Sequence, residues 1–335
     1  MSTPRIAEPR VQAVPTTMRA AAIDQFGPSK VLTLHTLPTP KSGSGEVLIA
    51  MHAAGVGVWD AEARKGSYTS GRERFPLVLG TDGAGVVVDR GSRVRRHDVD
   101  DRVWAYEFSN PKGGFYAEYV AVNAERVGRV PRRLNLLQAG AAAVTGLTAL
   151  QGVDDHLQVK EGETVLIFGA AGAVGTLAVQ FAKRLHARVI GVIRGRDAAD
   201  LVLELGADAA IDSTSGDIVG QLGAAAPDGL DAVLALAGGK TLEACLDVVR
   251  DDGRVAYPNG VEPELESRAG VRVVSYDAVA GPREFAELEA AVEQASLQVP
   301  IAGAYPLERA ADAHAQLEGG HVLGRIVLRI SGEQD

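Results

Sequence analysis

The second half of the chain alternates short apolar runs with segments of helical character. Six apolar runs follow one another between residues 164 and 276: TVLIF, ARVIGVI, AAID, DAVLALA, GRVAYP and VRVVSY. Between them the pattern predicts helices over 173–185, 197–205, 217–223 and 240–249. The runs do not alternate apolar with polar residues, which is typical of strands buried on both faces. The pattern therefore predicts an α/β fold, a parallel sheet with helices on both sides.

The first part of the chain has a different period. Short β-type runs separated by Gly, Pro and Asp occur between residues 18 and 127: MRAAAI, EVLIAMHAAGV, AGVVVD, DRVWAY and FYAEYVAV. They predict a β-rich, mostly antiparallel domain, preceded by a loose leader over residues 1–17. The Ala- and Leu-rich segment 134–153 is predicted to form a connecting helix, 283–298 another helix, and GRIVLRI the last strand.

Three glycines mark the first strand-to-helix turn of the second half. Gly169, Gly172 and Gly175 lie in VLIFGAAGAVGTLAVQFAK, where an apolar run ends and a helical one begins. Such a turn lets the backbone approach a pyrophosphate, and the N–H groups of the following helix face its charge. The spacing GxxGxxG is weaker evidence for a dinucleotide site than GxGxxG. The alternative is that these glycines serve only the close packing of strand and helix. We predict a dinucleotide site because strands and helices alternate on both sides of the turn.

The next run, ARVIGVIRGRD, bears on the choice of nucleotide. An acidic residue at the end of this strand would bind the ribose hydroxyls of NADH, but here Arg194 and Arg196 follow Ile193. Guanidinium groups suit phosphate oxygens, so the pattern favours NADPH. Asp197 is expected to cap the following helix. The alternative is that both arginines are solvated loop residues that bind no ligand.

Composition narrows the class of protein. The 335 residues carry a net charge of −9, which argues against nucleic acid or an anionic membrane as partner. Cys245 is the only cysteine, so a disulfide framework is excluded and a reducing compartment is indicated. No apolar run approaches the ~18 residues of a membrane span, and the N-terminus lacks the apolar core of a signal peptide. We therefore expect a cytoplasmic protein with no nucleic-acid or membrane partner.

Several separated motifs resemble the zinc-independent medium-chain dehydrogenases/reductases of the quinone oxidoreductase type. They occur in order over about residues 18–330: FPLVLGTDGAGVVVDRGSRV, DDRVWAY, GGFYAEYVAV, AAAVTGLTAL, ETVLIFGAAGAVGTLAVQFAKRLHARVIGV, LGADAAID, GGKTLEACLDVVRDDGRVAY and GRIVLRI. The resemblance implies a GroES-like catalytic domain, residues 18–128 and 278–335, and a doubly wound Rossmann domain, residues 129–277. It also implies NADPH as cofactor and a homodimer.

The resemblance assigns roles to individual residues. Besides the glycines and arginines named above, Ala173 and Val174 match positions at the pyrophosphate, and Thr145 matches one near the nicotinamide. Asn259 and Gly260 match the cofactor cleft. Asp60 and Tyr68 match the polar and aromatic positions that flank the active-site mouth, so both are candidate catalytic residues; a packing role is the alternative for Tyr68.

The chain departs from the family at several of these positions. Gly57 replaces a frequent Asn, Ala61 and Glu62 stand where a Tyr is common, and a Lys of the 2′-phosphate loop is missing near Ala198. The first two differences put direct substrate contacts in doubt, and the third leaves Arg194 and Arg196 to bind the 2′-phosphate. The aromatic residues expected to form apolar walls of the substrate pocket are Trp59, Tyr68, Tyr106 and Phe108.

Metal ligation is not expected. Gly57 and Val58 occupy the place of the first Cys ligand of a zinc alcohol dehydrogenase, and Thr81 and Asp82 that of its His-Glu pair. The seven histidines show no ligand spacing, and only His52, in the run VLIAMHAAGV, is a candidate acid.

Hydride transfer without a metal suits acceptors that delocalise negative charge. We therefore expect an NADPH-dependent reductase of a small molecule, a quinone or an α,β-unsaturated carbonyl compound, with Tyr68 as a candidate proton donor. One alternative is an enoyl-thioester or biosynthetic double-bond reductase, although no basic stripe for a carrier is evident. Another is a non-catalytic NADPH-binding sensor.

Overall fold

Two sheets organise the protein, whose computed structural model describes residues 14–68 and 74–331. The parallel-sheet half contains six strands in the order β11-β10-β9-β12-β13-β14, all paired in parallel. The first strand of this half, β9, is central, and β10–β11 and β12–β14 extend from it in opposite directions. This order confirms the predicted doubly wound Rossmann sheet. The strands are β9 (Thr164–Phe168), β10 (Arg188–Ile193), β11 (Ala209–Asp212), β12 (Leu230–Ala235), β13 (Val249–Pro258) and β14 (Arg272–Tyr276).

Helices cover both faces of this sheet. Buried residues of α3 and α4 share one core with strands β9 and β10, whereas α5 and α6 pack on the opposite face. The helices are α3 (Gly175–Arg184), α4 (Arg196–Glu204), α5 (Ile218–Ala225) and α6 (Lys240–Leu246). The sequence predicted α6 to continue to residue 249, but β13 already begins at Val249. Val249 pairs with Leu230 of β12, so sheet pairing ends the helical path there.

The β-rich half contains the remaining strands. Seven of them form a sheet in which β15-β16-β3-β5-β6-β8 are neighbours and β7 pairs with β3; β2-β1-β4 form a separate small sheet. The first strand begins at Thr17, within the predicted leader, of which residues 1–13 lie outside the described part. The elements are β1 (Thr17–Ile23), β2 (Leu32–Pro38), β3 (Glu46–Val56), α1 (Val58–Lys65), β4 (Leu77–Val78), β5 (Asp82–Arg90), β6 (Arg102–Tyr106), β7 (Tyr119–Asn123), β8 (Val127–Arg129), β15 (Ile301–Pro306), α8 (Ala310–Gly319) and β16 (Arg325–Arg329).

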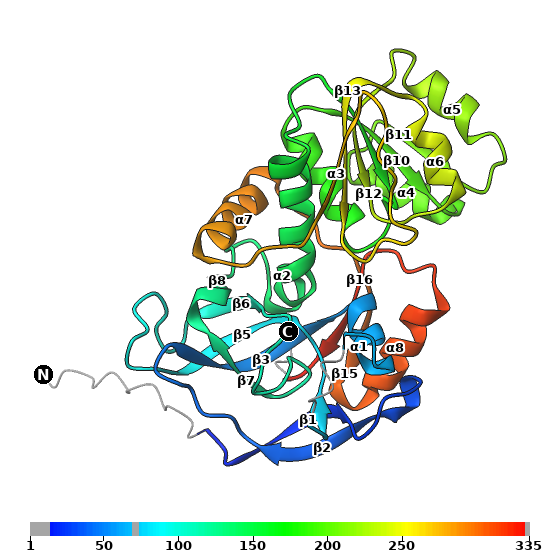
Figure 1. Cartoon of the computed structure of the whole chain (residues 1–335). Helices are drawn as coiled ribbons and strands as arrows, with labels where there is room; N and C mark the ends of the chain where they lie inside the picture. Colours follow the sequence, from blue (N-terminus) through cyan, green and yellow to red (C-terminus); the bar gives the residue numbers. More distant parts are fainter. Residues whose placement is uncertain (1–13, 69–73, 332–335) are drawn as a thin grey trace, which may run out of the picture.

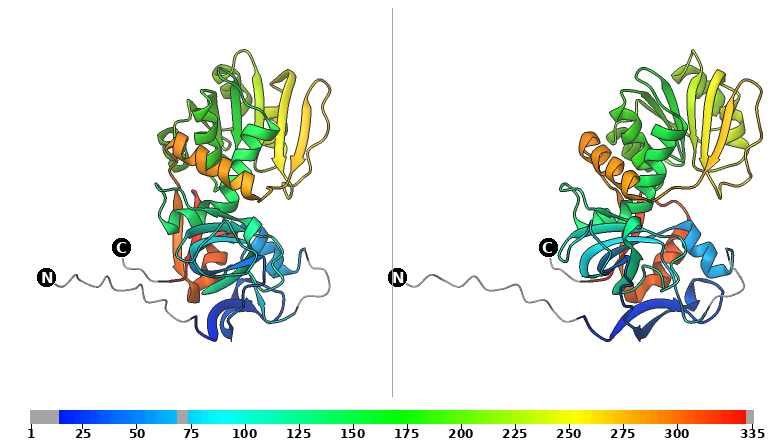
Figure 2. Two further views of the ribbon diagram at one scale, coloured as in Figure 1. Left: turned by 90° about the vertical axis from the view of Figure 1, so that its left-hand side faces the viewer. Right: turned by 60° about the vertical axis from the view of Figure 1, so that its left-hand side comes forward.

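Two helices, α2 (Leu136–Gln151) and α7 (Pro282–Ala295), lie at the junction of the halves (Figures 1 and 2). Helix α2 begins with a reciprocal cap, in which Asn135 and Gln138 each accept the other's backbone N–H. With the π turn at Gly152–His156 it is long and apolar enough to cross a membrane, but 89% of its most apolar window is buried in the protein. It is therefore a core helix, packed between the sheets.

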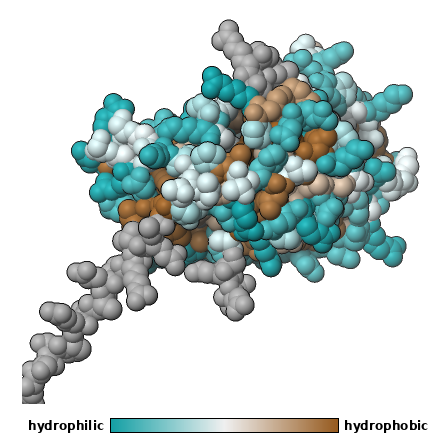
Figure 3. All heavy atoms as spheres, turned by 90° about the horizontal axis from the view of Figure 1, so that it is seen from below, coloured by the Kyte–Doolittle hydropathy of each residue, from teal (hydrophilic) through white to brown (hydrophobic). Residues whose placement is uncertain are grey.

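The end of the molecule opposite the parallel sheet is mainly polar. Figure 3 views this end and shows hydrophilic residues over most of it, with hydrophobic residues in small groups between them. Interspersed apolar groups of this kind are ordinary on protein surfaces.

Candidate functional site

A cleft of about 700 Å³ lies between the two halves. From the parallel-sheet half it is lined at the carboxyl ends of β9, β10 and β12, the edge where open α/β sheets bind ligands. From the β-rich half it is lined by residues 56–59 and by the segment 321–326. The predicted residues that line it are Gly169, Gly172, Ala173, Val174, Gly175 and Arg194.

The glycine turn is tightly built. Gly169 has a φ of 87°, which favours glycine, and a Cβ on Gly175 would lie only 2.2 Å from the Gly169 carbonyl oxygen. Gly172 differs, because its Cβ would meet nothing closer than 3.5 Å. The turn thus needs Gly175 for its own packing, whereas Gly172 leaves open space on the cleft side. That geometry fits the close approach of a phosphate to the start of α3.

The C-terminal segment lies directly against this turn. The N–H of Gly324 donates to the Ala171 carbonyl at 2.9 Å, and Gly324 also forms a bridge with Gly172. The next residue, Arg325, lines the cleft although only 3% of it is exposed. Its Nη2 donates to Asp82 Oδ1 at 2.9 Å, and its guanidinium stacks on the Trp59 ring at 4.9 Å.

Arg325 also carries a buried Nε–H with no partner among the described residues. Buried donors are normally satisfied, and a guanidinium is suited to an anionic group. Arg325 and the open space at Gly172 line the same cleft, and this combination fits a dinucleotide phosphate. Sequence analysis missed this residue, although a lone Arg at the start of the otherwise apolar strand GRIVL was a usable signal.

Asp82, the partner of Arg325, is fully buried and also accepts the backbone N–H of Val144 at 3.3 Å. Burial raises its pKa, and the nearby Arg325 charge opposes that rise. Its carboxylate therefore holds the guanidinium in place from below the cleft.

Asp60 lies in a buried network instead of at the mouth. Its Oδ2 accepts the Gly57 N–H at 2.8 Å and the Tyr116 hydroxyl at 3.1 Å, which ties it to the start of α1. Only 1% of Asp60 is exposed, and it does not line the described cleft. Burial, and then the charge of Asp82, raise its pKa to about 7. The expected position flanking the mouth is thus corrected, because the capping contact turns the carboxyl inward.

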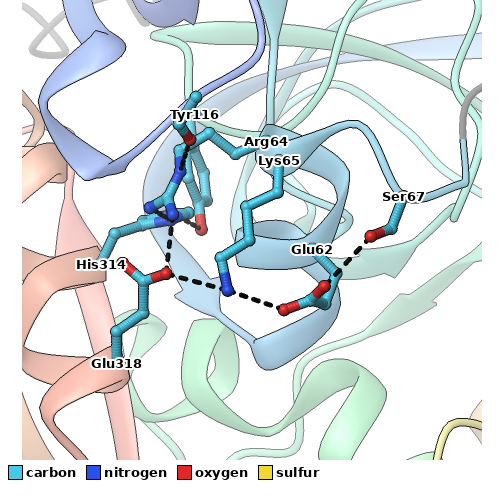
Figure 4. Close-up of polar contacts among 8 residues, drawn as sticks. Glu62, Arg64, Lys65, Ser67, Tyr116, His314 and Glu318 are labelled. Atoms are coloured by element: carbon cyan, nitrogen blue, oxygen red, sulfur yellow. Dashed lines mark hydrogen bonds and ion pairs between the residues drawn. The ribbon is translucent and has the colours of Figure 1, made fainter.

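The network continues to the surface through α8 (Figure 4). Arg64 Nη1 lies 3.1 Å from His314 Nδ1, and since Arg can only donate, that nitrogen accepts. His314 Nε2 then carries the hydrogen and donates to the Tyr116 hydroxyl at 3.2 Å. Burial and Arg64 lower the pKa of His314 to about 4, so the ring is neutral. Arg64 also pairs with Glu318 at 2.7 Å, which ends a directed chain running from the surface to Asp60.

Tyr68 lies at another part of the surface. It is 61% exposed, and its ring packs edge-on against Phe108 with centroids 5.6 Å apart. A Cβ on Gly260 would be 3.9 Å from the Tyr68 hydroxyl, so these residues are neighbours. Of the expected aromatic walls, Trp59 lines the described cleft, whereas Tyr68, Tyr106 and Phe108 do not.

Two other predicted cofactor residues use their side chains within the protein. Thr145 is buried in α2 and donates to the Ala141 carbonyl at 2.9 Å. Asn259 donates to Asp277 Oδ2 at 2.8 Å. Neither lines the described cleft, and nor does Gly260.

One end of the cleft is lined by Arg194, which follows β10, by Ser213, which follows β11, and by His321. Arg196, the first residue of α4, does not line it. His321 comes from the C-terminal segment, and its Nε2 lies 2.8 Å from Asp197 Oδ2. Neither Ser213 nor His321 was singled out from the sequence, because nothing in their local pattern distinguishes them.

Metal ligands are not gathered here. In the part of the chain that the structure describes, no group of three or more His, Cys, Asp or Glu could hold a metal ion. Thr81 stands where a zinc alcohol dehydrogenase would have part of its His-Glu pair, and its hydroxyl accepts the Trp59 indole N–H at 2.6 Å. His52 contacts Ser331 through Nδ1 at 3.3 Å and does not line the described cleft.

Known proteins with similar sequences and structures cover nearly the whole chain. The sequence model "Alcohol dehydrogenase GroES-like domain" matches residues 43–132, and "Zinc-binding dehydrogenase" matches residues 205–328. The quinone oxidoreductase of Mus musculus is 28% identical over 93% of this chain and 97% of its own. The mitochondrial NAD(P)H oxidoreductase of Bos taurus is 30% identical over 97% of this chain and 94% of its own.

Solved structures agree with these relatives. The quinone oxidoreductase from Coxiella burnetii superposes with a TM-score of 0.84 at 31% identity, over 94% of this chain and 100% of that one. The Escherichia coli quinone oxidoreductase complexed with NADPH gives a TM-score of 0.83 at 25% identity, over 93% and 100%. The predicted GroES-like and Rossmann combination is confirmed. The chain therefore belongs to the medium-chain dehydrogenase/reductase family, in its quinone oxidoreductase-like group.

Proposed function

We propose that this protein is an NADPH-dependent, zinc-independent oxidoreductase that reduces a quinone or an α,β-unsaturated carbonyl compound. The observation that carries the proposal is the cleft. It gathers an open glycine turn and the basic side chain of Arg194 along the carboxyl edge of a doubly wound sheet, with Arg325 facing them from the β-rich half. These groups match a dinucleotide: Gly172 and Arg325 would hold the pyrophosphate, and Arg194 the 2′-phosphate.

NADPH, when bound, supplies a hydride, and a proton from the protein or solvent completes the two-electron reduction of the acceptor. The chain contributes position and shape. Trp59, stacked on Arg325 and hydrogen-bonded to Thr81, forms a rigid wall of the cleft on the β-rich side. Acceptors that delocalise the incoming charge need no metal for polarisation. Among the described residues, Gly57 and Thr81 stand where zinc enzymes would have metal ligands, and neither side chain suits zinc. This supports acceptors that react without a metal.

The relatives support the same class of reaction. The Mus musculus relative is named a quinone oxidoreductase, and the Bos taurus relative is named an NAD(P)H oxidoreductase. The Escherichia coli structure is a complex with NADPH. We extend these to the present chain as a proposal. The homodimer and the cytoplasmic location remain predictions from the sequence.

Tyr68 and Asp60 receive different proposed roles. Tyr68, exposed beside Phe108 and Gly260, is the candidate proton donor, and unchanged turnover in Tyr68→Phe would remove it from the mechanism. Asp60 acts as a positioning residue, because its carboxyl fixes the loop at Gly57 that borders the cleft. Thr145, Asn259 and Gly260 stay predictions as cofactor residues.

The first experiment measures NADPH binding and metal content, and then NADPH oxidation with four acceptors: a benzoquinone, phenanthrenequinone, an alkenal and crotonyl-CoA. We expect turnover with a quinone or the alkenal, by protein that contains no stoichiometric zinc. NADH is assayed in parallel, and Arg194→Ala is expected to weaken NADPH binding about tenfold more than NADH binding, as loss of a charged hydrogen bond implies.

Each other outcome selects an alternative. Preference for crotonyl-CoA would favour an enoyl-thioester reductase. Tight NADPH binding without turnover of any acceptor would favour a non-catalytic sensor. Activity that follows zinc content would contradict the zinc-independent mechanism.

A further inference from the structure

The segment 320–324 crosses the carboxyl ends of two neighbouring strands of the parallel sheet. At one end, Gly324 is hydrogen-bonded to Ala171 in the turn after β9. At the other, His321 reaches Asp197 in the first turn of α4, which follows β10. Gly320, His321 and Gly324 have φ values of 75°, 52° and 90°, so the backbone turns sharply to make both contacts. The C-terminal segment is thereby fixed over the end of the cleft where Arg194 lies.

His321 is closely fitted to the loop it meets. Its Nε2 is 2.8 Å from Asp197 Oδ2, and a Cβ on Gly195 would lie 3.2 Å from its Cε1. His321 also lines the cleft together with Arg194 and Ser213. An imidazole from the β-rich half thus stands beside the loop of the parallel-sheet half that would recognise the adenosine ribose.

Asp197 would otherwise oppose the ligand proposed for this end. A 2′-phosphate carries about 1.5 to 2 negative charges at neutral pH, as other phosphate monoesters do. A carboxylate in the same loop repels that charge and is also an acceptor suited to the free ribose hydroxyls of NADH. The hydrogen bond from His321 lowers the pKa of Asp197, so the carboxylate is ionised at neutral pH.

We propose that His321 determines the nucleotide preference of this cleft, by neutralising Asp197 and donating a hydrogen bond to the 2′-phosphate of NADPH. The inference rests on the proposed NADPH-dependent function and adds a residue to it. An imidazolium has two N–H groups, so one can serve Asp197 while the other serves the phosphate. Arg194 and His321 then hold the phosphate from opposite halves of the molecule.

Asp197 is the acidic group paired with His321. The charged groups on the elements around His321 are Arg194, Arg196 and Asp197 of the β10–α4 region, Asp212 of β11, Glu318 of α8 and Arg325 of β16. Glu318 is paired with Arg64, Arg325 with Asp82, and Asp212 with Thr214, which leaves Asp197 as the acidic partner of His321.

The test measures dissociation constants of NADPH and NADH by fluorescence titration for the wild type, His321→Ala, and the matched control His186→Ala. His186 is also exposed and has a similar φ of 59°, but lies at the end of α3, away from the cleft. We expect His321→Ala to weaken NADPH about 5- to 10-fold and NADH less than about 2-fold, the size of one charge-assisted hydrogen bond at an exposed site. His186→Ala should change neither.

A double variant tests the neutralising role. Asp197→Asn in the His321→Ala protein should recover most of the lost NADPH affinity, because the unpaired carboxylate is removed.

Equal losses for NADPH and NADH would overturn the inference, since they indicate only a structural contact. So would an unchanged nucleotide ratio or no recovery in the double variant. If the wild type binds neither nucleotide, the proposed function itself fails, which is a different result from intact NADPH binding with an unaltered preference.

Discussion

Asp60 is a carboxyl group that the fold removes from water and supplies with two donors, Gly57 N–H and the Tyr116 hydroxyl. The donors favour the charged form, but burial and the neighbouring Asp82 outweigh them and raise the pKa of Asp60 to about 7. A raised carboxyl pKa means that the folded protein holds the proton more tightly than the unfolded chain does. Asp60 therefore stabilises the fold most at low pH.

The first prediction concerns the pH dependence of stability. The contribution of Asp60 is present below about pH 4 and is lost as pH rises to about 7, a change of up to about 4 kcal/mol for a shift of about 3 pKa units. Asparagine does not titrate. The free energy of unfolding of Asp60→Asn, relative to wild type, should thus increase between these pH values and stay level above them. Urea unfolding over this pH range measures it.

Asp208 provides a control of opposite sign. Burial alone would raise its pKa, but hydrogen bonds from Lys183 and the Val189 N–H lower it. Its stabilisation is present above the unfolded pKa and is lost as pH falls. Asp208→Asn should therefore cost stability at neutral pH and little in acid. A pH-independent difference for Asp60→Asn would show that Asp60 titrates normally.

At the scale of elements, two glycines of the turn between β9 and α3 have different roles: Gly175 is needed for packing, and Gly172 is expected to matter for binding. Gly175→Ala places a methyl 2.2 Å from the Gly169 carbonyl oxygen, so the turn must move. We expect a loss of about 1–3 kcal/mol in unfolding free energy, as overpacking usually costs. Gly172→Ala meets nothing closer than 3.5 Å and should leave stability near that of the wild type. Because its methyl enters the proposed pyrophosphate space, NADPH binding should weaken at least about tenfold.

Thermal unfolding and NADPH titration of both variants measure the two effects separately. Unchanged NADPH affinity in Gly172→Ala would place the pyrophosphate elsewhere in the cleft. Unchanged stability in Gly175→Ala would mean that the turn is more adaptable than its contacts indicate.

Sequence reasoning found the elements better than it found the contacts between them. The six parallel strands were recognisable because burial on both faces leaves uninterrupted apolar runs such as TVLIF. Helices α1 and α8 were not predicted, since α1 is short and the apolar period of α8 is weak. The glycine turn and Arg194 were also recognisable from the local sequence, because each directly follows such an apolar run. Arg325 and His321 reach the cleft only through the return of the C-terminal segment. A lone Arg in an apolar strand was a local signal for Arg325, but nothing in the pattern around His321 records that return.

At the scale of the whole molecule, the hydrophobic core does not follow the division into halves. One cluster contains Trp104 of β6 and Val327 of β16 together with Ile167 of β9 and Phe181 of α3. Helix α2 connects them, and it can lie close to β3 because Gly140 faces Ala53, where a Cβ would be 2.7 Å from the alanine Cβ. Shared burial of this kind couples the stability of the two sheets.

We therefore predict one cooperative unfolding transition for the whole chain. Both tryptophans, Trp59 and Trp104, belong to the β-rich half, so their fluorescence reports on it, whereas far-ultraviolet circular dichroism is dominated by helices, most of which lie outside that half. The two urea curves should coincide, because coincident probes are the mark of a two-state transition. Separate curves for the wild type would contradict the coupling.

Gly140→Ala should break this coincidence, because its methyl must push α2 away from β3 and so weakens the contact that joins the halves. Gly223→Ala is the matched control: Gly223 is also within a helix, α5, but a Cβ there meets nothing within 4 Å. It should keep one transition and gain about 0.5–1 kcal/mol, as glycine replacement inside a helix does. Coincident curves in Gly140→Ala would mean that α7 and the C-terminal segment are enough to hold the halves together, since Phe285 of α7 packs against Trp104 with ring centroids 5.9 Å apart.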